Sequence, residues 1–154
     1  MAPIDWRGTY TFTGNWASMY VVPSRDDQVS PKPLLDKLGV KPSHRVAVLN
    51  LDQPWFVEQL LARTPDVYVQ RRRVGLDLIF LGANDRGELR RVAGQRAFIK
   101  PDGAVWVVWP KGTKRITEND VRDAALAASL VDVKVVSFSD THSALKLVVR
   151  LVDR

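Results

Sequence analysis

From residue 45 to residue 151 the chain alternates between short apolar runs and amphipathic segments, and this alternation limits the fold more than any other feature. Runs such as Arg45–Leu51, Leu76–Leu81 and Ala104–Trp109 are almost continuously apolar, which is typical of strands buried on both faces. Segments such as Gln53–Ala62 carry apolar residues at helical spacing. The pattern predicts a three-layer α/β domain in which helices cover a mostly parallel sheet.

The last two apolar runs, Val131–Phe138 and Ala144–Leu151, are separated by only five residues, Ser139–Ser143. A parallel connection needs a crossover of about a dozen residues, so this pair must be antiparallel. With a further strand at Asp66–Gln70, the expected order is strand, helix, strand, strand, helix, strand, helix and a terminal antiparallel hairpin.

Local signals place several boundaries. Asn84 or Asp85 is expected to cap one helix, with Glu88 in a capping box, and Thr117 to cap another. Pro101–Gly103 predicts a turn, because proline presets its dihedral angle and glycine tolerates a positive one. Ser30 and Pro31 are expected to open a short helix that ends at Gly39.

Residues 1–29 differ from the rest of the chain. They hold five of the thirteen aromatic residues, and Gly14-Asn15 lies between two strand-like runs, which is a hairpin signal. We expect an aromatic N-terminal arm or hairpin over 1–29 and a single domain over 30–154. The arm either packs on the domain or forms a homo-oligomer interface.

Composition and charge indicate which partners and which cell compartment to expect. The net charge is +6, and residues 43–100 carry ten basic and six acidic side chains. A basic balance favours anionic partners. The chain has no cysteine, which excludes disulfides and thiolate sites. With no visible signal peptide and no apolar run long enough to span a bilayer, we expect a cytoplasmic protein without membrane association.

Several segments support a resemblance to known proteins. Leu76–Phe80 looks like the central strand of class I methyltransferases, and Lys100–Val107 looks like their proline-glycine turn and following strand. The domain therefore resembles the Rossmann-like class I methyltransferase fold with one strand–helix unit missing. An uncharacterised bacterial family of unknown function is also similar, through these segments: Lys37–Ala47, Trp106–Lys111, Ile116–Arg122, Leu130–Val135 and Ser143–Val148.

Two features that the resemblance implies are missing from the sequence. A cofactor loop needs glycines after the first strand, but Asn50–Trp55 contains none. A carboxylate is expected at the end of the second strand, but Gln70 and Arg71 stand there, and arginine cannot accept hydrogen bonds from a ribose diol. We therefore expect a non-catalytic domain with an accessory or binding role, without catalytic residues, metal or cofactor, S-adenosylmethionine included.

The place where a methyltransferase of this fold binds its cofactor could still bind another ligand, because open α/β sheets bind ligands beyond the carboxyl ends of their strands. An enzyme or sensor that binds an anionic, nucleotide-like small molecule there is one alternative. The same residues could instead cap helices or fill the core. The candidates at these strand ends are Asn50, Asp52, Gln70, Arg71, Gly82, Asn84, Trp109 and Lys111.

Basic clusters raise a second alternative, a nucleic-acid-binding module, since arginine pairs bidentately with phosphate. The chain shows no recognisable nucleic-acid-binding motif, and nothing in the sequence places the clusters on one face. A further cluster, Arg90, Arg91 and Arg96, lies on a predicted helix. The anion-binding candidates are Arg71, Arg72, Arg73, Lys114 and Arg115.

Overall fold

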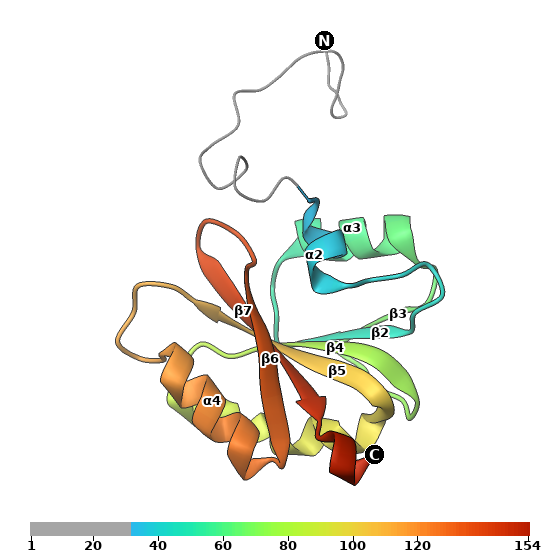
Figure 1. Ribbon diagram of the computed structural model, residues 1–154. Coiled ribbons are helices and arrows are strands. Elements are labelled where there is room, and N and C mark those ends of the chain that lie inside the picture. The colour runs from blue at the N-terminus through green and yellow to red at the C-terminus, as the bar shows by residue number, and fades with distance from the viewer. Residues whose placement is uncertain (1–31) are drawn as a thin grey trace. The chain divides into compact units, whose positions relative to one another are not determined.

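The computed structural model describes residues 32–154, which contain a six-stranded sheet of order β3-β2-β4-β5-β7-β6 (Figure 1). Strands β3, β2, β4 and β5 are parallel neighbours, and β7 joins antiparallel both to β5 and to β6. The predicted mostly parallel sheet with a closing antiparallel hairpin is confirmed. The strands are β2 (Val46–Leu49), β3 (Val67–Val69), β4 (Leu76–Gly82), β5 (Ile99–Pro110), β6 (Leu130–Ser137) and β7 (His142–Val149).

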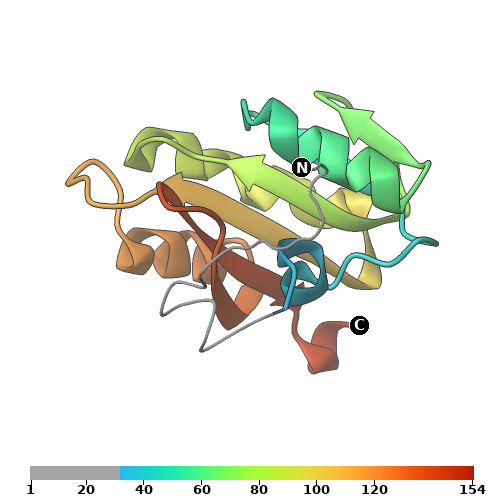
Figure 2. The ribbon, with the colours of Figure 1, turned by 90° about the horizontal axis from the view of Figure 1, so that it is seen from above.

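Helices cover both faces of the sheet, which makes the three layers (Figures 1 and 2). One face carries α2 (Leu34–Leu38) and α3 (Pro54–Arg63). The other carries the 3₁₀ helices η1 (Arg86–Arg91) and η2 (Ala93–Phe98) and the helix α4 (Glu118–Ala127). A short 3₁₀ turn, η3 (Leu151–Asp153), ends the chain.

Strand alternation divides the core into two hydrophobic clusters. Along β4, Leu78 and Phe80 belong to the cluster under α2 and α3, whereas Ile79 and Leu81 belong to the cluster under η1, η2 and α4. Because β4 and β5 are buried on both faces, they read as continuous apolar runs in the sequence.

The predicted arm over 1–29 and the Ser30-Pro31 helix start lie outside the described residues. Within them, α2 ends as predicted at Gly39, whose φ of 76° is in the left-handed region. No helix in residues 32–154 is long and apolar enough to cross a membrane.

The helix ends confirm the predicted caps, but one helix differs in type. Thr117 and Asp120 form a reciprocal capping box at α4, and the Asp85 carboxylate accepts a hydrogen bond from the Glu88 N–H. The segment that follows Asp85 is two short 3₁₀ helices instead of one helix. Gly87 and Gly94 lie within them, and glycine disfavours a continuous α-helix.

The residues of the predicted turn, Pro101–Gly103, are within the bounds of β5, but the pairing with β4 jumps from Ile99–Leu76 to Ala104–Leu78, so the segment is an irregularity in the strand. The reason for the glycine is spatial: a Cβ on Gly103 would lie 2.8 Å from the Asp77 carbonyl oxygen on β4. Gly103 therefore allows a close approach between neighbouring strands at their amino ends and has no need of a positive φ.

The connection from β3 to β4 is unusually short for two parallel strands. Val69 aligns with Val48 of β2, while Leu78 aligns with Val46, so Gln70–Gly75 must run back along the sheet to reach β4. Such a crossover ordinarily contains a helix. Here six residues make it in extended form, and this short crossover stands where one strand–helix unit is missing.

Candidate functional site

The turn after β2 is built around Asn50, a non-glycine residue with φ of 53°. Its backbone N–H donates to Gln70 Oε1 at 3.0 Å. Its side-chain Nδ2 donates to the Gly82 carbonyl at 2.9 Å and to Glu88 Oε1 at 3.1 Å. These three bonds tie the end of β2 to the segments that follow β3 and β4, and they hold Asn50 in the left-handed conformation that usually favours glycine.

Gly82, at the end of β4, lets the chain after β2 pass directly over that strand. A Cβ on Gly82 would lie 2.1 Å from the Asn50 carbonyl oxygen and 3.1 Å from the Leu51 Cα. No larger residue fits there without displacing the turn. Gly82 therefore lets the backbones of the turn after β2 and of β4 approach each other, which is a different role from that of the glycines expected in Asn50–Trp55 for the approach of the backbone to a ligand.

A pocket of about 450 Å³ opens beside this turn, at the carboxyl ends of β2, β3 and β4. We call it the strand-end pocket. The chain pairs β3 to one side of β2 and β4 to the other, so the pocket lies where the strand order reverses. Its volume is within the range of ligand sites. Its lining residues are Leu49, Asn50, Gln70, Arg72, Leu81, Arg90, Arg91, Gly94 and Gln95.

Arg72 is fixed in the pocket wall by several contacts. Its Nη1 donates to the Gly94 carbonyl at 3.2 Å and to Gln95 Oε1 at 3.1 Å, and its guanidinium lies 4.1 Å from the centre of the Phe98 ring. Gln95 is itself 5% exposed and donates to the Arg91 carbonyl at 2.9 Å. The crossover and η2 thus form one wall, which is joined by hydrogen bonds.

Of the candidates named from the sequence, Asn50, Gln70 and Arg72 line the strand-end pocket together. Gly82 does not line it but supports it from below. Asn84 is exposed beside it, and its backbone N–H donates to Glu88 Oε1 at 2.8 Å.

Other candidates lie elsewhere. Trp109 is 5% exposed and fills the core on the side of α4. Lys111 is exposed, and its Nζ donates to Ser137 Oγ at 2.9 Å. Asp52 is exposed and does not cap α3, whose first boundary residue is Gln53.

The remaining anion-binding candidates do not line the pocket. Arg71 and Arg73 lie near the ring of Tyr68, at 5.5 and 5.7 Å from its centre, and Arg73 Nη1 donates to its hydroxyl at 3.0 Å. Lys114 and Arg115 are exposed in the loop between β5 and α4.

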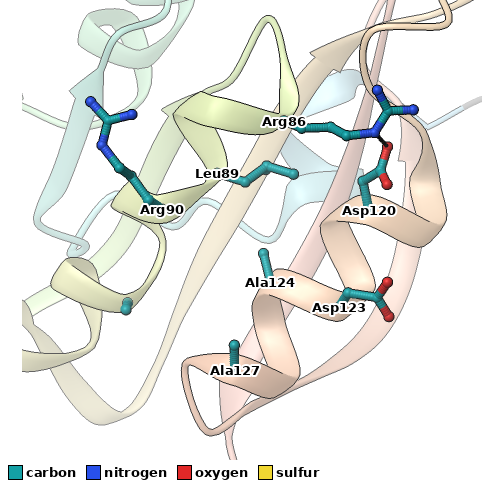
Figure 3. Close-up of a pocket in the computed structure, with 8 residues that line it drawn as sticks. Arg86, Leu89, Arg90, Asp120, Asp123, Ala124 and Ala127 are labelled. Atoms are coloured by element: carbon teal, nitrogen blue, oxygen red, sulfur yellow. Dashed lines mark ion pairs between the residues drawn. The ribbon is translucent and has the colours of Figure 1, made fainter.

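A second depression, of about 310 Å³, lies between η1 and α4 (Figure 3). Leu89, Ala124 and Ala127 give it an apolar floor, and the ion pair of Arg86 with Asp120, at 3.0 Å, lies at one end. Figure 3 shows Arg90 extending away from α4. This groove is within the helical layer and holds none of the candidates named from the sequence.

Sequence reasoning missed part of the pocket lining: Leu49, Leu81, Gly94 and Gln95, and it did not connect Arg90 and Arg91 with the site. Leu49 and Leu81 look like ordinary strand residues in the sequence. The available signal was their position, because both are at the carboxyl end of a predicted parallel strand.

No family model matches the chain, and no curated protein matches it. Solved structures do. An S-adenosylmethionine-dependent methyltransferase from Aquifex aeolicus matches with a TM-score of 0.61 and 12% identity over 83% of this chain and 98% of that one. CalO1, a methyltransferase of calicheamicin biosynthesis solved with S-adenosylhomocysteine bound, matches with a TM-score of 0.56 and 16% identity over 76% and 52%. The pyocyanin biosynthetic protein PhzM matches with a TM-score of 0.59 and 11% identity over 75% and 53%.

The chain thus spans nearly all of the Aquifex protein and about half the length of CalO1 and PhzM. These likenesses confirm the Rossmann-like, methyltransferase-like fold. They contradict our expectation of a non-catalytic domain that uses no cofactor, since the matched folds include S-adenosylmethionine-dependent enzymes and one with the product cofactor bound. That expectation relied on a missing glycine and a missing carboxylate. In the structure, Asn50 adopts a positive φ without being glycine, so the tight turn after β2 forms with no glycine in it.

Proposed function

We propose that this protein is an S-adenosylmethionine-dependent methyltransferase whose cofactor site is the strand-end pocket. One observation carries the proposal: in a methyltransferase-like fold, a pocket of about 450 Å³ opens at the carboxyl ends of β2, β3 and β4. This is where open α/β sheets bind their ligands.

The lining residues fit the chemical parts of S-adenosylmethionine. Leu49 and Leu81 offer apolar surface to an adenine ring. Gln70 Oε1 already accepts a hydrogen bond from the Asn50 N–H, which leaves its Nε2 to donate to a ribose hydroxyl. The guanidiniums of Arg90 and Arg91 suit the carboxylate of the methionine part.

S-adenosylmethionine, when bound, supplies an electrophilic methyl group. The role of this chain is to bind and orient it. The bonds from Asn50 to Gln70 Oε1 and to the Gly82 carbonyl fix the two strand ends that form the pocket floor. Such fixed geometry raises transfer rates by holding the reacting groups in position.

The proposal is tested by calorimetric titration of the full chain with S-adenosylmethionine and S-adenosylhomocysteine. Gly94→Phe places a large side chain in the pocket, because a Cβ at Gly94 meets no atom closer than 3.9 Å. Ala97→Phe adds the same ring to an exposed position of η2 outside the pocket and is the matched control.

We expect saturable binding by the wild-type chain and by Ala97→Phe, and loss of binding by Gly94→Phe. The proposal fails if the wild-type chain binds neither compound, or if Gly94→Phe binds them as tightly as the control does. Thermal melts of both variants show whether each is folded.

Three further expectations stay predictions. The resemblance to an uncharacterised bacterial family is carried by the segments quoted from the sequence. A cytoplasmic location is consistent with the lack of cysteine. Homo-oligomerisation through the aromatic residues of 1–29 is tested by size-exclusion chromatography of a chain that begins at residue 30.

A further inference from the structure

Three basic clusters that are far apart in the sequence are joined in space by η1. Arg90 and Arg91 of η1 line the strand-end pocket with Arg72 of the crossover. At the other end of η1, the Arg86 backbone N–H donates to the Arg115 carbonyl at 3.1 Å, and Arg86 Nη2 donates to the Lys114 carbonyl at 3.0 Å. We call the joined set the arginine band: Arg71, Arg72, Arg73, Arg90, Arg91, Lys114 and Arg115.

The charge of the arginine band is uncompensated. Within residues 32–154, none of its seven side chains makes an ion pair, and the hydrogen bonds of Arg72, Arg73 and Arg90 go to neutral groups. The carboxylates of Asp85 and Glu88 accept hydrogen bonds from neutral amides and keep their charges, so the seven cations of the band outnumber these two anions. A positive surface of this kind attracts an anionic partner.

The arginine band also continues beyond the strand-end pocket, on the crossover and on the loop before α4. Arg71 and Arg73 are the sequence neighbours of Arg72 in the pocket wall and lie beside Tyr68. Lys114 and Arg115 lie next to Arg86, at the opposite end of η1 from the two arginines that line the pocket. A 3₁₀ helix of six residues is about 12 Å long, so these two basic groups are separated by more than one phosphate spacing. A single small anion cannot bridge them, whereas a polyanion can.

Resting on the proposed methyltransferase function, we infer that the methyl acceptor is a nucleic acid, whose phosphates follow the arginine band past the strand-end pocket. Six of the seven basic residues are arginines, and the planar guanidinium matches phosphate bidentately. The guanidinium also pairs bidentately with carboxylates, so the choice of a nucleic acid rests on the regular spacing of its phosphates along an extended band, and polyglutamate tests the alternative of an acidic protein.

The test measures binding of a fluorescent 20-nucleotide RNA, and of DNA of the same sequence, to the full chain over a range of salt concentrations. Arg71→Gln/Arg73→Gln and Lys114→Gln/Arg115→Gln each remove two charges outside the pocket lining. Lys41→Gln/Arg154→Gln removes two exposed charges at the opposite end of the sheet and is the matched control. Polyglutamate serves as a competitor, and binding of S-adenosylmethionine is measured on every variant.

We expect each band variant to weaken binding about tenfold at low salt and to reduce the slope of log K against log salt by about one. The control variant and S-adenosylmethionine binding stay at wild-type values. The inference is overturned if neither oligonucleotide binds at low salt, if the control variant weakens binding equally, or if polyglutamate competes as well as unlabelled RNA. Oligonucleotide binding without S-adenosylmethionine binding would overturn the proposed function and leave the nucleic-acid contact in place.

Discussion

The two ends of the parallel strands differ sharply in their electrostatics. At the amino ends, charges are paired: Arg45 with Asp66 at 3.2 Å, and Lys100 with Asp77 at 3.0 Å. At the carboxyl ends, Arg86 pairs with Asp120 at 3.0 Å, but none of the seven side chains of the arginine band makes an ion pair within residues 32–154. A charge that is paired within the fold is less available to a ligand, whereas a charge without a partner can attract an anionic ligand.

Backbone strain follows a similar division. Among residues 32–154, three non-glycine residues have a positive φ: Asn50 at 53° and Gln70 at 56°, at the carboxyl ends of β2 and β3, and Ser129, just before β6. Residues in such conformations persist only where surrounding contacts hold them, and they concentrate at functional sites. The carboxyl ends of the strands thus hold two residues with strained backbones and the unpaired arginine band, whereas the charges named at the amino ends are paired.

The largest expected effect on stability comes from replacing a glycine by alanine, and one glycine at each end of the strands allows a comparison. Gly82→Ala would place a Cβ 2.1 Å from the Asn50 carbonyl oxygen, and Gly103→Ala would place one 2.8 Å from the Asp77 carbonyl oxygen. We expect a loss of about 3 kcal/mol in the free energy of unfolding for Gly82→Ala and about 1–2 kcal/mol for Gly103→Ala. Only Gly82→Ala should abolish binding of S-adenosylmethionine. Urea unfolding and calorimetry measure the two effects, and equal loss of binding would remove the distinction between the ends.

The second prediction separates strain from hydrogen bonding at Asn50. Asn50→Ala loses the side-chain bonds to Gly82 and Glu88 and keeps the unfavourable φ, so we expect it to lose about 2 kcal/mol of stability. Asn50→Gly loses the same bonds but suits the positive φ, so it should be about 1 kcal/mol more stable than Asn50→Ala. Equal stability of the two variants, measured by denaturant unfolding, would show that the turn is unstrained.

At the amino ends, Asp77 provides a pH-dependent contribution. Burial by itself raises the pKa of Asp77, but the hydrogen bond from the Arg45 N–H and the Lys100 ammonium outweigh it and lower the pKa. A carboxyl whose folded-state pKa is lowered stabilises the fold above its unfolded pKa, and this stability is lost as pH falls through the folded pKa.

Asp77→Asn should therefore cost about 1 kcal/mol at pH 7 and nothing in strong acid. Thermal melts across pH 2–7 measure the difference between variant and wild type. A difference that is constant with pH would mean that the role of Asp77 is not electrostatic.

The smallest expected effect is a change in the pKa of a histidine. His44 lies at the amino ends of the parallel strands and His142 at the carboxyl ends. Burial lowers the pKa of both His44 and His142, and Lys111 lowers the pKa of His142 further. Since the unfolded state then binds more protons, each histidine reduces stability as pH falls below its unfolded pKa. In an NMR titration, Lys111→Gln should raise the pKa of His142 and leave that of His44 unchanged. A matching shift at His44 would point to a general effect of net charge.

Much of the fold could be predicted from the sequence because its signals are local. The apolar runs, the five-residue link Ser139–Ser143 and the capping residue Thr117 each act within a few residues, and all three appear in the structure as expected. At Pro101–Gly103 the local signal marks an irregularity in the pairing of β5 with β4, but β5 begins before it, at Ile99, because pairing with Leu76 extends the strand.

The site was predicted only in part. Asn50, Gln70 and Arg72 were accessible from their positions after strands, whereas Trp109 fills the core. Gly94 and Gln95 could not be placed, because only the packing of η2 on the crossover brings them to the pocket.

By itself, the sequence determined the order of strands and helices, the antiparallel ending and the excess of positive charge, since periodicity, link length and composition are properties of the chain. Only the tertiary structure shows that a pocket opens at the carboxyl ends of β2, β3 and β4. The sequence pattern called for a glycine within Asn50–Trp55 to make the turn after β2, but in the structure Asn50 makes that turn, and Gly82 of β4 leaves room for its backbone. A close approach depends on which backbones meet in space, and that is set by the pairing of β2 with β4.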